Sequence, residues 1–272
     1  MSDLAGPGPL RVHDAGACRT LVLDRPARRN ALDDGLLRSL RDALLAARDD
    51  GAVRSIVLAG AGPCFSSGRD RAEMGGGRAV LQDGSLDATV GLFTEVLRLL
   101  VASPKPTVAA VHGYALAGGQ ALTLACDFVV AERGARFGNP EMLYGFPAAM
   151  NTVLLARHLG RRRALEIALT GGVYLAEEGV AMGLVNRLCE PGELGAATRA
   201  FTDALDALAP WAVRRTKRLF LAVEDASLDE ALSAGDALNE LLRANAQLAP
   251  LFGTDEPGRD ALLDRMRRGS TT

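Results

Sequence analysis

Two short apolar runs in this chain each lead directly into a glycine-rich loop. Residues 53–59 (VRSIVLA) are followed by a loop with two serines that ends at Gly68. Residues 107–111 (TVAAV) enter a turn that contains Gly113, Gly118 and Gly119. Apolar runs of this length, bounded by glycine, are typical of strands buried in a parallel sheet. The pattern predicts an α/β fold with a strand at each run.

Helical patterns alternate with the expected strands. The expected elements, in chain order, are strand 19–23, a helix from 33 toward 48 capped by Asp33, strand 53–59, a helix around 90–100, strand 107–111, a helix from 118 toward 127, strand 128–131, helical sequence from 150 onward and a short helix at 163–170. After about residue 200 only amphipathic helix patterns remain. The Gly/Pro-rich first ten residues are predicted to be loose. We predict an α/β core over residues 1–191 and a helical C-terminal subdomain over residues 192–272.

Composition excludes several classes of function. The formal net charge is −2 and aromatic residues make up 4% of the 272 residues. Neither a basic surface for nucleic acid or an anionic membrane nor a base-stacking platform is expected. Residues 107–126 carry no charge, but their glycines, Gln120 and His112 fit a strand, a turn and a buried helix better than a membrane span. The N-terminus has no secretory pattern, so a cytoplasmic location is expected.

The four cysteines lie far apart in the sequence and include no CxxC pair, and the chain has only three histidines. No metal site is expected from such spacing, and a disulfide framework is not expected either. The cysteines are predicted to be reduced, buried thiols.

Common nucleotide-binding and hydrolase motifs are incomplete. The turn at 113–119 lacks the Lys-Ser/Thr of a phosphate loop, and Phe65 occupies the position of the third glycine in a dinucleotide fingerprint. Ser66 and Ser67 do not form a GxSxG elbow, and His112 is the only candidate base for a serine hydrolase.

Four motifs in the same order resemble those of the crotonase superfamily, the enoyl-CoA hydratase/isomerase family. They are RPxxRNAL at 25–32, IVLAG…FSSGRD at 56–70, PKPTVAAVHGYALAGG…ACD at 104–127 and ARFGNPE at 135–141. The resemblance covers roughly residues 19–260. It implies a spiral of ββα units followed by C-terminal helices that mediate trimerisation, with trimers commonly paired into hexamers. It also implies an acyl-CoA thioester as substrate, so that coenzyme A enters as part of the substrate. No metal or redox cofactor is expected.

The resemblance assigns an oxyanion hole to the backbone N–H groups of Arg69 and Gly118. Family members stabilise a thioester enolate, and donors aimed at the developing oxyanion stabilise it strongly. Gly118 also stands at an expected helix start, where the helix dipole favours negative charge. The alternative is that Gly118 and the glycines near it only form a turn and allow tight packing of helix against strand. The Arg69 side chain is expected either to reach a CoA phosphate or to point into solvent.

Glu141 matches one of the two glutamates of family hydratases and is the expected general base. The second hydratase glutamate would stand at Ala121, and the further acid of family dienoyl isomerases would stand at Ala149. One base suffices to move a proton between C2 and C4, whereas hydration also needs an activated water. A 3-enoyl to 2-enoyl isomerase is therefore favoured. The alternatives are an enoyl-CoA hydratase, another crotonase-type lyase or hydrolase, and a non-catalytic acyl-CoA-binding homologue.

The remaining expectations concern substrate binding. Arg28 and Arg29 lie where the family binds the adenine-ribose phosphate end of CoA, although a solvated basic turn is the alternative. Tyr144 is expected either to line the acyl pocket or to belong to the core, and residues 73–85 are expected to cap the acyl site. The full set of expected substrate- or CoA-binding residues is Arg28, Arg29, Ala31, Ser66, Ser67, Gly68, Asp70, Ala117 and Tyr144.

Overall fold

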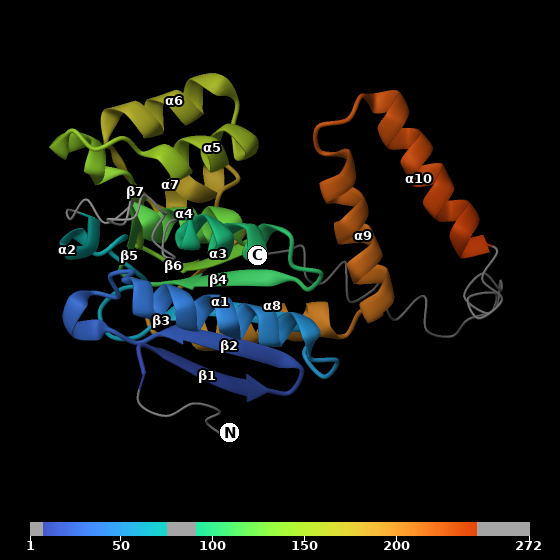
Figure 1. The fold of residues 1–272 in the computed structure, drawn as a ribbon, viewed down its shortest axis with the longest axis horizontal. Helices are drawn as coiled ribbons and strands as arrows, with labels where there is room; N and C mark the ends of the chain where they lie inside the picture. The colour runs from blue at the N-terminus through green and yellow to red at the C-terminus, as the bar shows by residue number, and fades with distance from the viewer. Residues whose placement is uncertain (1–7, 75–90, 244–272) are drawn as a thin grey trace, which may run out of the picture. The chain divides into compact units, whose positions relative to one another are not determined.

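A computed structural model describes residues 8–74 and 91–243 of the 272-residue chain. The chain divides into two compact units, residues 1–215 and 216–272. The first unit holds two sheets and most of the helices (Figure 1). Its strands are β1 (Leu10–Ala15), β2 (Cys18–Leu23), β3 (Ser55–Gly60), β4 (Thr107–Val111), β5 (Tyr114–Leu116), β6 (Phe128–Glu132), β7 (Arg136–Gly138), β8 (Val173–Leu175) and β9 (Arg187–Cys189).

The larger sheet has the strand order β1-β2-β3-β4-β6-β9. The β1–β2 pair is antiparallel, and the pairs from β2 to β9 are parallel. Strand β4 lies in the middle and all five of its residues are buried, as expected for a strand covered on both faces. The smaller sheet has the order β5-β7-β8.

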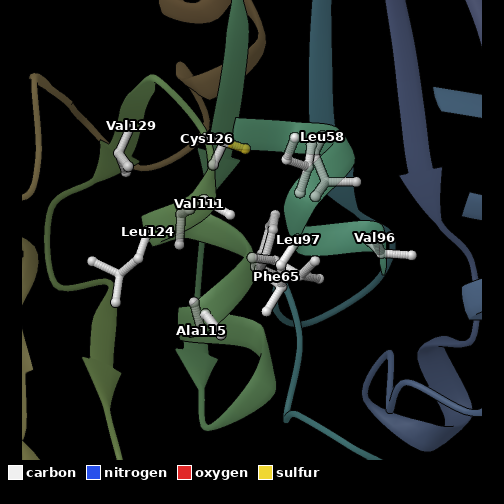
Figure 2. Close-up of a cluster of buried hydrophobic side chains, with 14 of the residues drawn as sticks. Leu58, Phe65, Val96, Leu97, Val111, Ala115, Leu124, Cys126 and Val129 are labelled. Carbon is white, nitrogen blue, oxygen red and sulfur yellow. The ribbon is translucent and has the colours of Figure 1, made fainter. Parts of the chain in front are cut away.

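Side chains alternate between the two faces of the larger sheet. Ile56 and Leu58 of β3 belong to the main apolar core, whereas Val57 belongs to a second cluster on the opposite face. Figure 2 shows part of the main core. The residues labelled there come from strands β3 to β6, helices α3 (Leu92–Val101) and α4 (Gly118–Ala125) and the connecting segments at Phe65 and Cys126. In the second cluster, Phe128 packs edge-on against Phe201 with 5.1 Å between the ring centres.

The helices of the first unit cover both faces of the sheet and surround the small one. They are α1 (Asp34–Asp49), α2 (Arg71–Met74), α3 (Leu92–Val101), α4 (Gly118–Ala125), α5 (Ala149–His158), α6 (Arg161–Thr170), α7 (Ala176–Ala181) and α8 (Leu194–Asp206), with the 3-10 helices η1 (Pro26–Arg28) and η2 (Pro140–Tyr144). Helix α1 begins as predicted, because the Asp33 carboxylate accepts a hydrogen bond from the Leu36 N–H at 2.8 Å.

Three turns of the chain repeat one pattern: a strand in the larger sheet, a short pairing in the smaller one, then helix. Strand β3 is followed by Ser66, which bridges to Ala115. Strand β4 is followed by β5 and α4, and β6 by β7 and η2. This is the ββα spiral that the sequence predicted.

One segment differs from the sequence prediction, and one helix bears on the predicted domain division. Residues 1–7 of the segment predicted to be loose lie outside the described residues, but its last residue, Leu10, begins β1, where backbone hydrogen bonds to β2 and burial order the chain. Helix α8 was assigned to the C-terminal subdomain, but it lies on the larger sheet through Phe201. The predicted division near residue 191 remains a prediction.

The second unit contains the end of α9 (Pro210–Val223) and all of α10 (Leu228–Arg243). Helix α10 buries none of its own residues, and its exposed apolar side chains are Leu228, Leu232 and Leu241. The helix pattern predicted after about residue 200 continues as far as residue 243, and the rest lies outside the described residues.

Candidate active site

The spiral brings the three predicted catalytic positions to one place, because each follows a strand or bridge of the smaller sheet. Arg69 comes three residues after the bridge residue Ser66, Gly118 two residues after β5, and Glu141 three residues after β7. Since β5 pairs with both Ser66 and β7, the segments that leave these pairings lie side by side.

The amides of Arg69 and Gly118 are neighbours. A methyl group added at Gly118 would lie 3.2 Å from the Arg69 amide nitrogen. Gly68 has a φ of +97°, and a methyl group there would lie 2.8 Å from Ala117 Cβ and 3.0 Å from the Gly118 nitrogen. Position 68 therefore requires glycine, both for its backbone conformation and for this close approach.

Both amides are available to a ligand. Arg69 is bridged to Leu32, but the bonds of that bridge run from the Leu32 N–H to Gly68 O and from the Asp70 N–H to Leu32 O. Within residues 8–74 and 91–243, no acceptor for the Arg69 or Gly118 N–H is found. Gly118 is also the first residue of α4, where the helix dipole favours a negative ligand. Two such donors can hold an oxyanion.

The residue before Gly118 has an unusual backbone conformation. Ala117 has φ 51° and ψ −119°, a combination that favours glycine. Its amide donates to Gly138 O at 2.9 Å, and its carbonyl accepts from the Asn151 side chain at 2.8 Å. Bonds at both ends hold the strained residue in place.

The carboxylate of Glu141 is linked to this segment through the side chain of Asn151. Its Oε1 accepts from Asn151 Nδ2 at 3.4 Å, and the same nitrogen donates to Ala117 O. Its Oε2 is buried and has no hydrogen-bond partner among the described residues. Burial raises the pKa of Glu141 above its ordinary value, although the Asn151 hydrogen bond opposes this shift. A carboxylate with a raised pKa is suited to take and return a proton near neutral pH.

The position of the missing second glutamate is apolar. Ala121 is fully buried within the main core, on the first turn of α4. The next residue toward the N-terminus, Gln120, is also fully buried, and its amide nitrogen lies 3.3 Å from the Tyr174 hydroxyl. Ala149 is exposed at the start of α5. Glu141 is thus the one carboxylate that the predicted catalytic positions supply.

The enoyl-CoA hydratase/isomerase family model matches residues 15–249. The chain belongs to this family. It is 37% identical over 241 residues to a candidate enoyl-CoA hydratase of Thermus thermophilus, covering 86% of this chain and 92% of the relative. It is 34% identical over 215 residues to the crotonyl-CoA hydratase of Syntrophomonas wolfei, covering 78% and 81% of the two chains. An enoyl-CoA hydratase structure from Mycobacterium smegmatis superposes with a TM-score of 0.82 at 29% identity, covering 95% and 97% of the two chains.

Membership of the enoyl-CoA hydratase/isomerase family makes this chain a crotonase-type acyl-CoA enzyme. The resemblance seen in the sequence is confirmed, and so is the crotonase fold. Among the described residues, no helix has the length and apolarity that crossing a membrane requires.

The residues predicted to bind the nucleotide end of CoA lie on an exposed turn. Arg28 ends η1, and Arg29 follows it with a left-handed φ of 54°. Both side chains are exposed, which leaves them open to a phosphate. Ala31 is half-buried, and its amide donates to Arg28 O at 3.1 Å.

The two serines in the set of expected CoA-binding residues make structural contacts. Ser66 is fully buried; its hydroxyl donates to Asn30 O at 2.8 Å and accepts from the Gly68 N–H at 3.2 Å. The Ser67 amide donates to Arg29 O at 3.0 Å. These bonds fix the loop that presents the Arg69 amide.

Two predicted charged residues are engaged by protein partners. The Arg69 side chain pairs with Asp34 at 3.1 Å, an arrangement that neither sequence alternative anticipated. Asp70 pairs with Arg25 at 3.3 Å, and Arg25 also pairs with Asp33 at 2.8 Å. This ion-pair network joins the loop at 70 to the start of α1.

Tyr144 is not part of the core, because 73% of its surface is exposed. Its ring stacks under the Arg71 guanidinium, 5.3 Å from the ring centre. Residues 75–85 of the expected acyl cap lie outside the described residues. Sequence reasoning missed Asn151, whose only signal was a polar residue on the face of α5 that carries the buried Leu155.

Proposed function

We propose that this chain isomerises a 3-enoyl-CoA to a 2-enoyl-CoA, with Glu141 as the single acid–base group. The proposal rests on the residues at the two catalytic positions: Glu141 is a half-buried carboxylate, and Ala121 is fully buried and apolar. Glu141 can carry a proton, whereas Ala121 cannot hold or activate water.

In the proposed reaction the thioester oxygen accepts hydrogen bonds from the Arg69 and Gly118 amides. Glu141 takes a proton from C2, and the electron pair moves into a dienolate whose negative oxygen lies in the oxyanion hole. Glu141 then returns the proton at C4, so that the double bond moves from C3–C4 to C2–C3. Each oxyanion donor is expected to stabilise the transition state by about 2.7–4 kcal/mol.

Hydration of a 2-enoyl-CoA is the second candidate. The names of the Thermus thermophilus and Syntrophomonas wolfei relatives favour it. In this chain Glu141 alone would have to activate the water and supply the proton.

The two candidates are separated by assaying the purified chain on a 3-enoyl-CoA and on a 2-enoyl-CoA, alongside Ala121→Glu. The proposal expects rapid isomerisation, slow hydration, and faster hydration in the variant. Efficient hydration by the unmodified chain would replace the proposal with a hydratase. Binding of CoA thioesters without turnover of either would favour a non-catalytic homologue.

The other expectations of the family are part of the proposal. The chain is proposed to bind CoA through Arg28 and Arg29, to need no metal or redox cofactor, to assemble as a trimer or hexamer and to act in the cytoplasm. Exposed apolar side chains such as Leu143, Val153 and Leu169 are compatible with an oligomer. Analytical ultracentrifugation tests the assembly.

A further inference from the structure

Asn151 is a buried polar residue that no predicted catalytic role includes. It lies in the first turn of α5, and only 2% of it is exposed. Its side-chain nitrogen donates to Ala117 O at 2.8 Å and lies 3.4 Å from Glu141 Oε1. One amide group therefore joins the oxyanion-hole segment to the base.

The orientation of this amide follows from its neighbours. Ala117 O and the Glu141 carboxylate both accept hydrogen bonds, so the side-chain nitrogen of Asn151 must face them. The opposite orientation would place a carbonyl oxygen against two acceptors. Asn151 Oδ1 is left buried without a partner among the described residues. An unpaired buried oxygen is unfavourable, which indicates that the two donated bonds determine the orientation.

The bond to Ala117 O acts on the oxyanion hole through one peptide group. The Ala117 carbonyl and the Gly118 N–H are opposite ends of the same planar unit. Fixing the carbonyl therefore fixes the direction in which the N–H points. A donor on the carbonyl also polarises the peptide and strengthens the N–H as a donor. The same carbonyl also accepts from the Ala121 N–H at 3.1 Å, so Asn151 supplies a second donor to it. The φ of 51° at Ala117 is one that alanine does not favour, and the two donors together hold it.

We propose that Asn151 is a positioning residue that sets the Gly118 N–H and the Glu141 carboxylate against the same substrate. It touches neither the reacting carbons nor the thioester oxygen; it acts through the two groups that do. This inference rests on the proposed function, because it takes Glu141 as the base and Gly118 as an oxyanion donor.

The test compares Asn151→Leu and Asn151→Ser with Thr152→Ala. Leucine matches the size of asparagine without its donors, and serine keeps one short donor. Thr152 is the matched control because it is the exposed neighbour on the same helix, and within the described part of the chain its hydroxyl bonds only to Ala148 O. Each variant is assayed for kcat and KM on the acyl-CoA that the chain turns over, and its Tm is measured.

We expect kcat to fall roughly 100-fold in Asn151→Leu, since misplacing one oxyanion donor costs about that much. KM should stay within about three-fold, because the residue holds no part of the substrate. Asn151→Ser should lie between Asn151→Leu and the unmodified chain. Thr152→Ala should match the unmodified chain.

The pH profile adds a readout that a purely structural role would not move. Loss of the Asn151 donor should shift the acid limb of kcat/KM to higher pH, because that hydrogen bond stabilises ionised Glu141. Helices α2, α5 and α6 lie next to η2, and among the described residues none of their charged or titratable groups contributes to the shift of the Glu141 pKa. These groups are Arg71, Glu73, Arg157, His158, Arg161, Arg162, Arg163 and Glu166.

The outcomes separate this inference from the proposed function. If Glu141→Gln abolishes turnover while both Asn151 variants keep the original kcat and pH profile, the positioning role is wrong and the base assignment stands. If Glu141→Gln keeps full turnover, the proposed function itself is wrong. If Asn151→Leu does not fold, Asn151→Ser decides by the same readouts.

A second probe is a bound 3-ketoacyl-CoA, whose enolate absorbs in the near ultraviolet. A smaller enolate fraction in both Asn151 variants than in Thr152→Ala supports the proposal. An equal fraction in all three overturns it.

Discussion

The two sides of the site differ in how they are built. The oxyanion side consists of backbone amides, held by strand bridges, by the glycine at 68 and by the constrained peptide after Ala117. The base side is one side chain, Glu141, on the five-residue helix η2. Among residues 8–74 and 91–243 its one side-chain hydrogen-bond partner is Asn151, and exposed apolar residues such as Leu143 and Tyr144 follow it in the sequence. The path of the backbone therefore determines the geometry of the oxyanion side, whereas the identity of one side chain determines the base side.

The largest expected effect on the oxyanion side comes from Gly68→Ala. A methyl group there would lie 2.8 Å from Ala117 Cβ and would require a strained positive φ. We expect kcat to fall roughly 100-fold as the Gly118 amide shifts. Gly16→Ala is the matched control, because Gly16 also has a positive φ (+64°) but an added methyl group meets nothing within 4 Å. Equal activity of the two variants would contradict a hole built on close backbone approach.

On the base side, burial of the ionised Glu141 carboxylate should lower the stability of the folded chain in a way that depends on pH. Because burial raises the pKa of Glu141, the folded chain favours the protonated form. Its contribution to stability is present below the pKa of the unfolded chain and is lost as pH rises through the folded pKa. Glu141→Gln should therefore raise Tm at about pH 8, and the gain should vanish near pH 4. A gain of equal size at both pH values would show that ionisation is not its cause.

The smallest effect is expected for Arg69→Ala. Its role is assigned to the backbone N–H, and its side chain pairs with Asp34, with 22% and 25% of the two side chains exposed. We expect kcat to stay within about three-fold, with a lower Tm because Asp34 loses its partner in a partly buried position. A loss of kcat as large as that of Gly68→Ala would show that the guanidinium acts on the substrate.

The same contrast explains what could be predicted from the sequence. Strands β2, β3 and β4 and helices α1 and α4 were predicted because apolar runs, glycines and a capping aspartate are local signals. The three-residue strands β5, β7 and β8 were not, since their hydrogen bonds come from partners far along the chain. Asn151 was missed for the same reason: its contacts lie ten and 34 residues away. The Arg69 pairing with Asp34 likewise depends on a contact across 35 residues.

Turnover of Glu141→Gln tests the central claim most directly, with Glu166→Gln as its control. Glu166 is an exposed glutamate on α6 that pairs with Arg163 at 2.7 Å and does not contribute to the raised pKa of Glu141, so its substitution removes a carboxylate that has no assigned role. Our account predicts that Glu141→Gln lowers kcat on the acyl-CoA substrate by about 1000-fold while Glu166→Gln leaves it unchanged. Retention of full activity by Glu141→Gln would contradict the assignment of a single carboxylate base.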